Sequence, residues 1–217
     1  MSQPSRRIEF DFNRYDEPQW TPWRDERYPT AGAWTQEEGF IVPRTRPGAT
    51  EEELFGVGGN GCFAMRMLRD LRMADGRLEM DVSLTDRAAP YLCFRVQPGA
   101  NGVHGSLYAL VVFNQVWGGT GEQGVNLWKF FSADGARPAA WRKLAWWNVP
   151  IPRERRLSLG AAFRKERMRV WFDGALLGDA CDYEPLGPGM AGFAAIEGIT
   201  RFHRFAAEGV DLGNSAV

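Results

Sequence analysis

The fold is decided between Leu157 and Val210, where the sequence reads LSLGAAFRKERMRVWFDGALLGDACDYEPLGPGMAGFAAIEGITRFHRFAAEGV. In its MRVWF segment, apolar residues alternate with Arg169 and Trp171, which is the period of a half-buried strand. The dipeptide Asp173-Gly174 that follows favours a tight hairpin turn, because both residue types tolerate positive φ. The stretch predicts strands over Leu157–Phe163, Arg167–Phe172, Met190–Ile196 and Thr200–Ala206.

Similar runs recur along the rest of the chain, with turn residues between them and no long helical period. The further predicted strands are Ile8–Phe12, Gly39–Val42, Cys62–Leu68, Leu78–Leu84, Tyr91–Val96, Leu107–Phe113, Val125–Phe131 and Trp141–Trp147. Many short strands separated by turns indicate an all-β protein built as an antiparallel β-sandwich. We expect one such domain over residues 31–217, preceded by a tail and an ordered loop over residues 1–30, pinned by Trp20 and Trp23.

Composition limits the kinds of partner and site. The 217 residues carry a net charge of −1, so no global field attracts nucleic acid or an anionic membrane. Three Cys without metal-type spacing and only two His argue against a complete disulfide framework and against a His-rich zinc site. No cofactor or metal is predicted, although calcium stays open, and the sequence fixes no oligomeric state.

The N-terminal segment has no apolar stretch of the kind that a secretory leader needs, and no later segment is long and apolar enough to span a membrane. As written, the chain is expected to be soluble and cytoplasmic. It would be a secreted protein if a leader had been removed from it.

The order of these motifs resembles the concanavalin A-like lectin and glucanase superfamily. LEMDVSL, YLCFRV, YALVVFN and VNLWKF are followed by RMRVWFDG, GMAGFAAIEG and FHRFAAEGV. The pattern is most similar to laminin-G-like modules and to the domains of family 16-type and 3-keto-disaccharide hydrolases. The resemblance covers residues 38–210 and implies a jelly roll of two curved antiparallel sheets. In members that bind or cleave sugars, the ligand lies on the concave sheet.

Catalysis in this superfamily would need paired carboxylates. Family 16 glycanases carry Glu-x-Asp-x-Glu, and this chain matches the first two positions with Glu79 and Asp81 but has Ser83 at the third. A strand places the backbones of Glu79 and Asp81 roughly 7 Å apart, within the range that inverting glycosidases use. Glu197 is a third candidate carboxylate. The alternative is that Glu79 and Asp81 form a solvated strand face.

A polysaccharide lyase would instead need a cation and a base, and Arg95 with Tyr108 or His203 would supply them. Arg95 is predicted to point away from the inter-sheet core, onto the floor of the concave groove, because Leu92, Phe94 and Val96 must bury. Its alternative is an internal partner such as Glu79 or Asp81.

Sugar binding asks for less: an aromatic ring for C–H groups and planar polar groups for hydroxyls. Asn114, Gln115 and Trp117 supply these beside a Gly-rich loop, and Asn126, Trp128 and Lys129 supply them again. Trp146, Trp147 and Trp171 are assigned to packing. The basic runs Arg153–Arg156 and Arg164–Arg169 are interpreted as solvated edges that discourage aggregation.

These observations predict a lectin-like sandwich that binds an oligosaccharide or glycoside on its concave sheet. Two alternatives remain open. One is a glycoside hydrolase or related sugar-processing enzyme, or a lyase, and the other is a protein-interaction module.

Overall fold

The structure is a computed structural model that describes residues 5–24, 30–49, 63–85, 88–99, 103–114, 122–131, 140–196 and 198–211. Its strands are β1 Ser5–Asp11, β2 Trp20–Trp23, β3 Ala33–Glu37, β4 Phe40–Arg44, β5 Ala64–Leu84, β6 Ala89–Val96, β7 Leu107–Phe113, β8 Gly124–Phe131, β9 Ala140–Trp147, β10 Leu157–Arg164, β11 Arg167–Phe172, β12 Ala175–Cys181, β13 Gly189–Ile196 and β14 Thr200–Asp211. A single 3₁₀ turn, η1 at Glu17–Gln19, precedes β2. No helix in the described part of the chain is long and apolar enough to cross a membrane.

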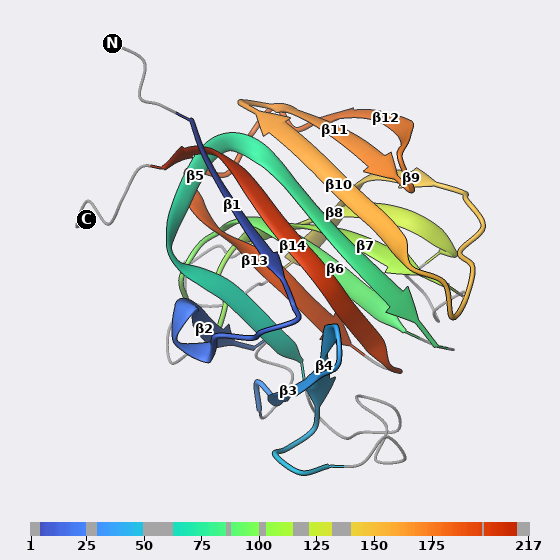
Figure 1. Cartoon of the computed structure of the whole chain (residues 1–217). Coiled ribbons are helices and arrows are strands. Elements are labelled where there is room, and N and C mark those ends of the chain that lie inside the picture. Colours follow the sequence, from blue (N-terminus) through green and yellow to red (C-terminus); the bar gives the residue numbers. More distant parts are fainter. Residues whose placement is uncertain are drawn as a thin grey trace.

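The strands form two layers that share one long strand (Figure 1). The front sheet has the order β12-β11-β10-β5-β14-β1, and the back sheet has the order β2-β5-β13-β6-β7-β8-β9. All these strand pairs are antiparallel. The all-β antiparallel sandwich predicted from the sequence is confirmed.

Strand β5 joins the sheets because its two halves have different neighbours. Residues 64–73 pair with β13, whereas residues 76–82 pair with β10. The sequence predicted two separate strands here, Cys62–Leu68 and Leu78–Leu84, with Cys62 outside the described residues. Gly76 lies at the crossover, where a Cβ would come within 2.6 Å of the carbonyl oxygen of Glu208. A residue without a side chain therefore lets β5 pass close to β14.

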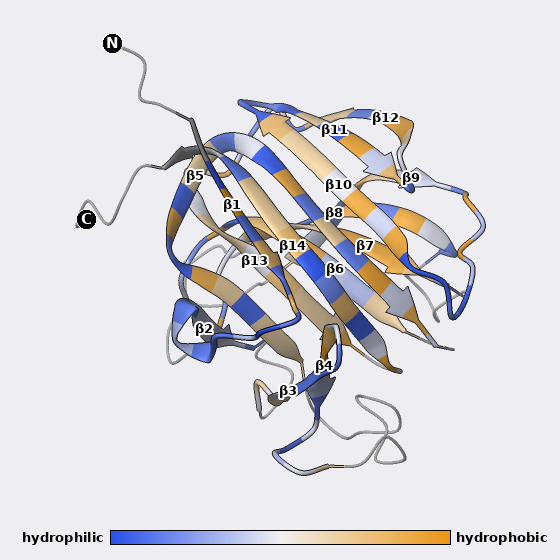
Figure 2. Ribbon diagram, in the orientation of Figure 1, coloured by the Kyte–Doolittle hydropathy of each residue, from blue (hydrophilic) through white to orange (hydrophobic). Residues whose placement is uncertain are grey.

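The core lies between the two sheets, and alternation along the front-sheet strands produces it (Figure 2). Met80 and Val82 of β5 pack there with Phe202 and Phe205 of β14, while the residues between them face outward. The central strands of the back sheet, β13, β6 and β7, are buried on both faces. Along β7, Tyr108, Leu110 and Val112 face the core, and the intervening residues join a second apolar cluster on the outer face. Burial on both faces explains why LYALVVF is continuously apolar.

The first thirty residues, predicted as a tail and an ordered loop, contain two strands that belong to the sandwich. Strand β1 pairs with β14 along its whole length, and β2 pairs with β5. Trp20 is fully buried against Phe193 and Phe205, with ring centroids 4.9 and 5.6 Å away. The segment around Trp20 and Trp23, which the sequence assigned to a loop, is therefore an edge strand that closes the core.

The hairpin predicted at Asp173-Gly174 is present between β11 and β12. Both turn residues have positive φ, 52° and 79°. Strand β12 itself, like β3, was not predicted, since neither segment alternates clearly. The described cysteines, Cys93 and Cys181, are both free.

Candidate functional site

Arg95 is a structural residue and not part of a groove floor. Its backbone has φ of 47°, which breaks the alternation of β6, so that Val96 joins the outer cluster instead of the core. The guanidinium donates from Nε to the carbonyl oxygen of Ala74 at 2.7 Å and from Nη1 to that of Leu186 at 3.2 Å. It also lies 5.5 Å from the ring centre of Phe163 and is 3% exposed. The prediction that Arg95 faces the groove is wrong, and the internal alternative holds, with Asp75 as the carboxylate partner at 3.4 Å.

Tyr108 and Lys129 also have internal partners, because both bind the buried carboxylate of Asp182. Tyr108 donates from Oη to Asp182 Oδ2 at 2.7 Å, and Lys129 Nζ lies 2.8 Å from the same oxygen. Arg142 Nη2 lies 2.6 Å from Asp182 Oδ1. Burial and the bond to Asp182 raise the pKa of Tyr108, so it is a poor general base. This geometry gives no support to a lyase reaction that uses Tyr108.

Glu79 and Asp81 face outward from the front sheet, and arginines neutralise both. Arg204 bridges them, with Nη2 3.0 Å from Glu79 Oε2 and Nε 3.2 Å from Asp81 Oδ2. Arg77 adds a 2.6 Å contact to Glu79, and Arg156 adds a 2.7 Å contact to Asp81.

The ion pairs around Glu79 prevent the raised pKa that a general acid needs. Burial alone would raise the pKa of Glu79, but Arg204 and Arg77 hold it below its usual value. A glycosidase acid needs a raised pKa, so this pair resembles the solvated ionic face that was the alternative. Glu197, the third candidate carboxylate, lies outside the described residues.

His203 and Ser83 form a contact that the sequence did not suggest, because they are far apart in the chain. Ser83 Oγ and His203 Nε2 lie 3.0 Å apart, and His203 Nδ1 lies 3.3 Å from the carbonyl oxygen of Gly39. Burial is the main cause that lowers the pKa of His203. The ring of Phe40 packs on the imidazole, with centroids 5.6 Å apart. These contacts join β14, β5 and the β3–β4 turn.

Asn126 and Trp128 lie on the outer side of the back sheet, and Asn114 follows the end of β7. Asn126 Nδ2 donates to the carbonyl oxygen of Glu122 at 2.8 Å, and Asn114 Nδ2 donates to that of Thr85 at 2.5 Å. The Oδ1 atoms of both amides and Nε1 of Trp128 are buried without a hydrogen-bond partner. Gln115 and Trp117 lie outside the described residues. A ligand role for these five residues stays a prediction.

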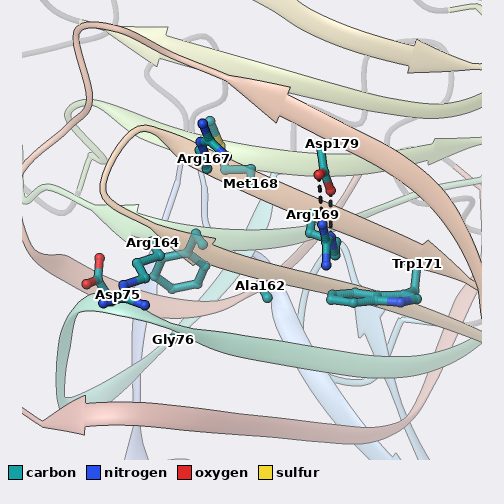
Figure 3. Close-up of a pocket in the computed structure, with 10 residues that line it drawn as sticks. Asp75, Gly76, Ala162, Arg164, Arg167, Met168, Arg169, Trp171 and Asp179 are labelled. Atoms are coloured by element: carbon teal, nitrogen blue, oxygen red, sulfur yellow. Dashed lines mark hydrogen bonds and ion pairs between the residues drawn. The ribbon is translucent and has the colours of Figure 1, made fainter.

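A surface hollow of about 460 Å³ lies over β10 and β11 of the front sheet (Figure 3). We call it the Trp171 hollow. Arg167, Arg169 and Trp171 of β11 form one wall, and Ala162 of β10 lies on the floor. The outward positions of β10 are all small before Arg164, namely Ser158, Gly160 and Ala162, so the taller side chains of β11 stand above a trough.

Trp171 separates this hollow from a second one of about 230 Å³. The second hollow is lined by Ser158, Gly160, Glu79 and Arg204, among others. Trp171 is partly exposed, and the guanidinium of Arg77 lies 4.9 Å from its ring centre. The assignment of Trp171 to packing is wrong. The signal was present in MRVWF, where Trp171 shares a face with Arg169 and not with the buried Met168, Val170 and Phe172.

No metal centre is found among the residues that the structure describes, where no three His, Cys, Asp or Glu side chains gather closely enough to hold an ion. The groups available to a ligand at the front sheet are an indole, several guanidinium groups and a trough of small residues.

The sequence matches no protein-family model and no curated protein. Solved structures are similar over nearly the whole chain. A carbohydrate-binding module from Bacillus subtilis is 18% identical, covers 84% of this chain and 96% of its own, and has a TM-score of 0.59. A prokaryotic β-1,3-1,4-glucanase (lichenase) from a mouse hindgut metagenome is 10% identical, with coverages of 94% and 99% and a TM-score of 0.60.

A third structure, the kappa-carrageenase from Pseudoalteromonas carrageenovora in complex with an oligotetrasaccharide of kappa-carrageenan, is 11% identical. It covers 96% of this chain and 97% of its own, with a TM-score of 0.58. At these identities the likeness concerns the fold. The fold is the concanavalin A-like jelly roll that the motif order implied, shared by carbohydrate-binding modules and glycoside hydrolases.

Proposed function

We propose that this protein binds carbohydrate in the Trp171 hollow and does not cleave it. The observation that carries the proposal is the partly exposed indole of Trp171, which stands between two hollows on a floor of small residues. An indole offers an apolar face to sugar C–H groups, and guanidinium groups donate to hydroxyls beside it. Structural neighbours that bind or act on polysaccharides support the proposal at the level of the fold.

Binding without cleavage follows from the state of the nearby carboxylates. Glu79 lines the second hollow, but Arg77 and Arg204 hold it in its charged form. Asp81, the other candidate, is paired with Arg156 and Arg204. A carboxylate that is held ionised does not donate a proton to a leaving oxygen, so Glu79 does not fit the role of the glycosidase acid.

The test is a glycan array followed by calorimetry on the strongest oligosaccharide, with wild type and Trp171→Ala. Loss of the indole should weaken binding at least tenfold, about 1.4 kcal/mol, because the stacking surface is removed. Trp141→Ala is the matched control. Trp141 is 50% exposed on β9 of the back sheet, away from the hollow, and its loss should leave affinity unchanged.

Three outcomes would reject the proposal. Folded protein that binds no neutral or acidic glycan would favour the protein-interaction alternative. Release of sugar from a bound oligosaccharide, abolished by Glu79→Gln or Asp81→Asn, would restore the hydrolase alternative. Binding that survives Trp171→Ala but is lost in Asn126→Ala would move the site to the outer face of the back sheet.

A further inference from the structure

We propose that the saccharide held in the Trp171 hollow is anionic, and that Arg164 and Arg167 bind its sulfate or carboxylate group. This inference rests on the proposed function and adds the chemical class of the ligand. The arginines of the front sheet differ in whether they have a carboxylate partner.

Most arginines on the outer face of the front sheet are paired with a carboxylate. These are Arg7 with Glu9, Arg77 with Glu79, Arg156 with Asp81, Arg169 with Asp179, and Arg204 with Glu79 and Asp81. Within the described residues, Arg164 and Arg167 make no such pair, and both line the Trp171 hollow.

The two carboxylates that line the same hollow already have other partners. Asp179 accepts two bonds from Arg169, at 2.7 and 2.9 Å, as Figure 3 shows. Asp75 Oδ1 accepts the backbone N–H of Lys165 at 2.8 Å and lies 3.4 Å from Arg95. The hollow therefore contains two guanidinium groups that form no ion pair within the described residues, although the charge of Arg167 helps Arg169 to lower the pKa of Asp179.

Arg164 and Arg167 also stand directly opposite each other in the β10–β11 hairpin. Like charges at facing positions of an antiparallel pair destabilise it, since their Cβ atoms are only about 5 Å apart. Both side chains are exposed, so water weakens this repulsion but supplies no opposite charge. An anion bound between the two would convert this repulsion into two charge-assisted hydrogen bonds.

The position of the pair relative to Trp171 indicates how the ligand lies. Arg167, Arg169 and Trp171 project from the same face of β11, so the anion site and the indole are about 13 Å apart along the strand. A ligand that contacts both must extend along β11. An oligosaccharide with a charged substituent beyond the stacked ring fits this arrangement, and the apolar floor at Ala162 suits its C–H groups.

The experiment compares ligands that differ only in charge. A glycan array containing neutral, sulfated and uronate oligosaccharides should show binding to the anionic classes. Calorimetry would then compare the best ligand with its desulfated or methyl-esterified counterpart. We expect the anionic form to bind at least tenfold more tightly, with an affinity that falls as salt rises.

Arg164→Gln and Arg167→Gln should each weaken the anionic ligand at least tenfold and leave the neutral counterpart unchanged. Arg7→Gln removes the same charge from the far edge of the same sheet and should have no effect. Relief of the repulsion should leave the melting temperatures of the two hollow variants equal to or above wild type, which separates a binding loss from a folding defect.

Each result decides between the two proposals. Equal binding of the charged and neutral forms overturns the anionic assignment but leaves carbohydrate binding intact. Absence of binding to every glycan rejects the proposed function itself. Inorganic sulfate that matches the affinity of the sulfated glycan would show a simple anion site, and the saccharide part of the inference would fall.

Discussion

Asp182 is the residue at which polar side chains from three neighbouring strands of the back sheet converge. Tyr108 of β7, Lys129 of β8 and Arg142 of β9 form one row across the sheet, and all three contact this carboxylate, whose side chain is fully buried. Because Asp182 follows β12, the contact ties the edge of the front sheet to the back sheet. Removing the charge would leave the buried ammonium of Lys129 without a counter-ion, with the carbonyl oxygen of Glu184 as its remaining acceptor.

Asp182→Asn should therefore lower the free energy of unfolding by about 3–5 kcal/mol, measured by urea denaturation. Asp179→Asn is the control. Its ion pair with Arg169 is more than half exposed, so its loss should cost less than about 1 kcal/mol. Equal stability of the two variants would show that the Asp182 network is not a determinant of stability.

The carboxylate of Asp182 also makes the free energy of unfolding depend on pH in the acidic range. Burial alone would raise the pKa of Asp182, but hydrogen bonds from Lys129 and Tyr108 hold it below its usual value. A lowered folded pKa adds stability that is complete above the unfolded value of about 3.9 and is lost as pH falls through the folded value. Urea titrations from pH 6 to pH 2 should show a shallower loss for Asp182→Asn than for wild type.

At this scale, the sequence predicted which residues share a strand face but not where a face is interrupted. Glu79 and Asp81 point outward as alternation requires, and MRVWF contained the outward position of Trp171. Arg95 was misplaced because a positive φ at a non-glycine residue leaves no mark in a single sequence. The role of Lys129 depended on Asp182, a partner too distant in the chain to be recognised.

At the scale of elements, β5 and β13 show how the sheets are fitted together. The sequence contains Asp75-Gly76, the same pair type as the hairpin turn Asp173-Gly174, between the two predicted strands Cys62–Leu68 and Leu78–Leu84. In the structure the chain continues through it, because β14 and β10 take over as neighbours. The residue types at Asp75-Gly76 allow the chain to turn. Whether it turns there or continues as one strand depends on which distant strands pair with it.

Strand β13 has an irregularity next to Gly192, where its register against both β5 and β6 shifts. A Cβ at Gly192 would lie 2.0 Å from the carbonyl oxygen of Arg66 and 2.8 Å from Cα of Met67. Gly192→Ala should lower the free energy of unfolding by at least about 1–3 kcal/mol, because the backbones must move apart. Gly187→Ala, where nothing lies within 4 Å, should unfold at nearly the wild-type urea concentration.

At the scale of the molecule, the two sheets share β5 and a single inter-sheet core. Neither sheet can lose its pairing without uncovering that core, so we expect one cooperative unfolding transition. Far-ultraviolet circular dichroism and tryptophan fluorescence should give the same midpoint in urea. Two separated midpoints would indicate that the sheets unfold independently. Fold class was predictable at this scale because turn spacing and alternation are local, whereas the pairing of β1 with β14 was not.

That last pairing has a consequence for how the chain is made. Residues 200–211 supply the neighbour that β1 lacks and complete one side of β5, yet a ribosome synthesises them after every other described strand. At about 5–20 residues per second, β1 waits for tens of seconds with an open edge. Until β14 emerges, the nascent chain exposes unpaired backbone along both strands, which makes it a substrate for chaperones and vulnerable to pairing with another copy of itself.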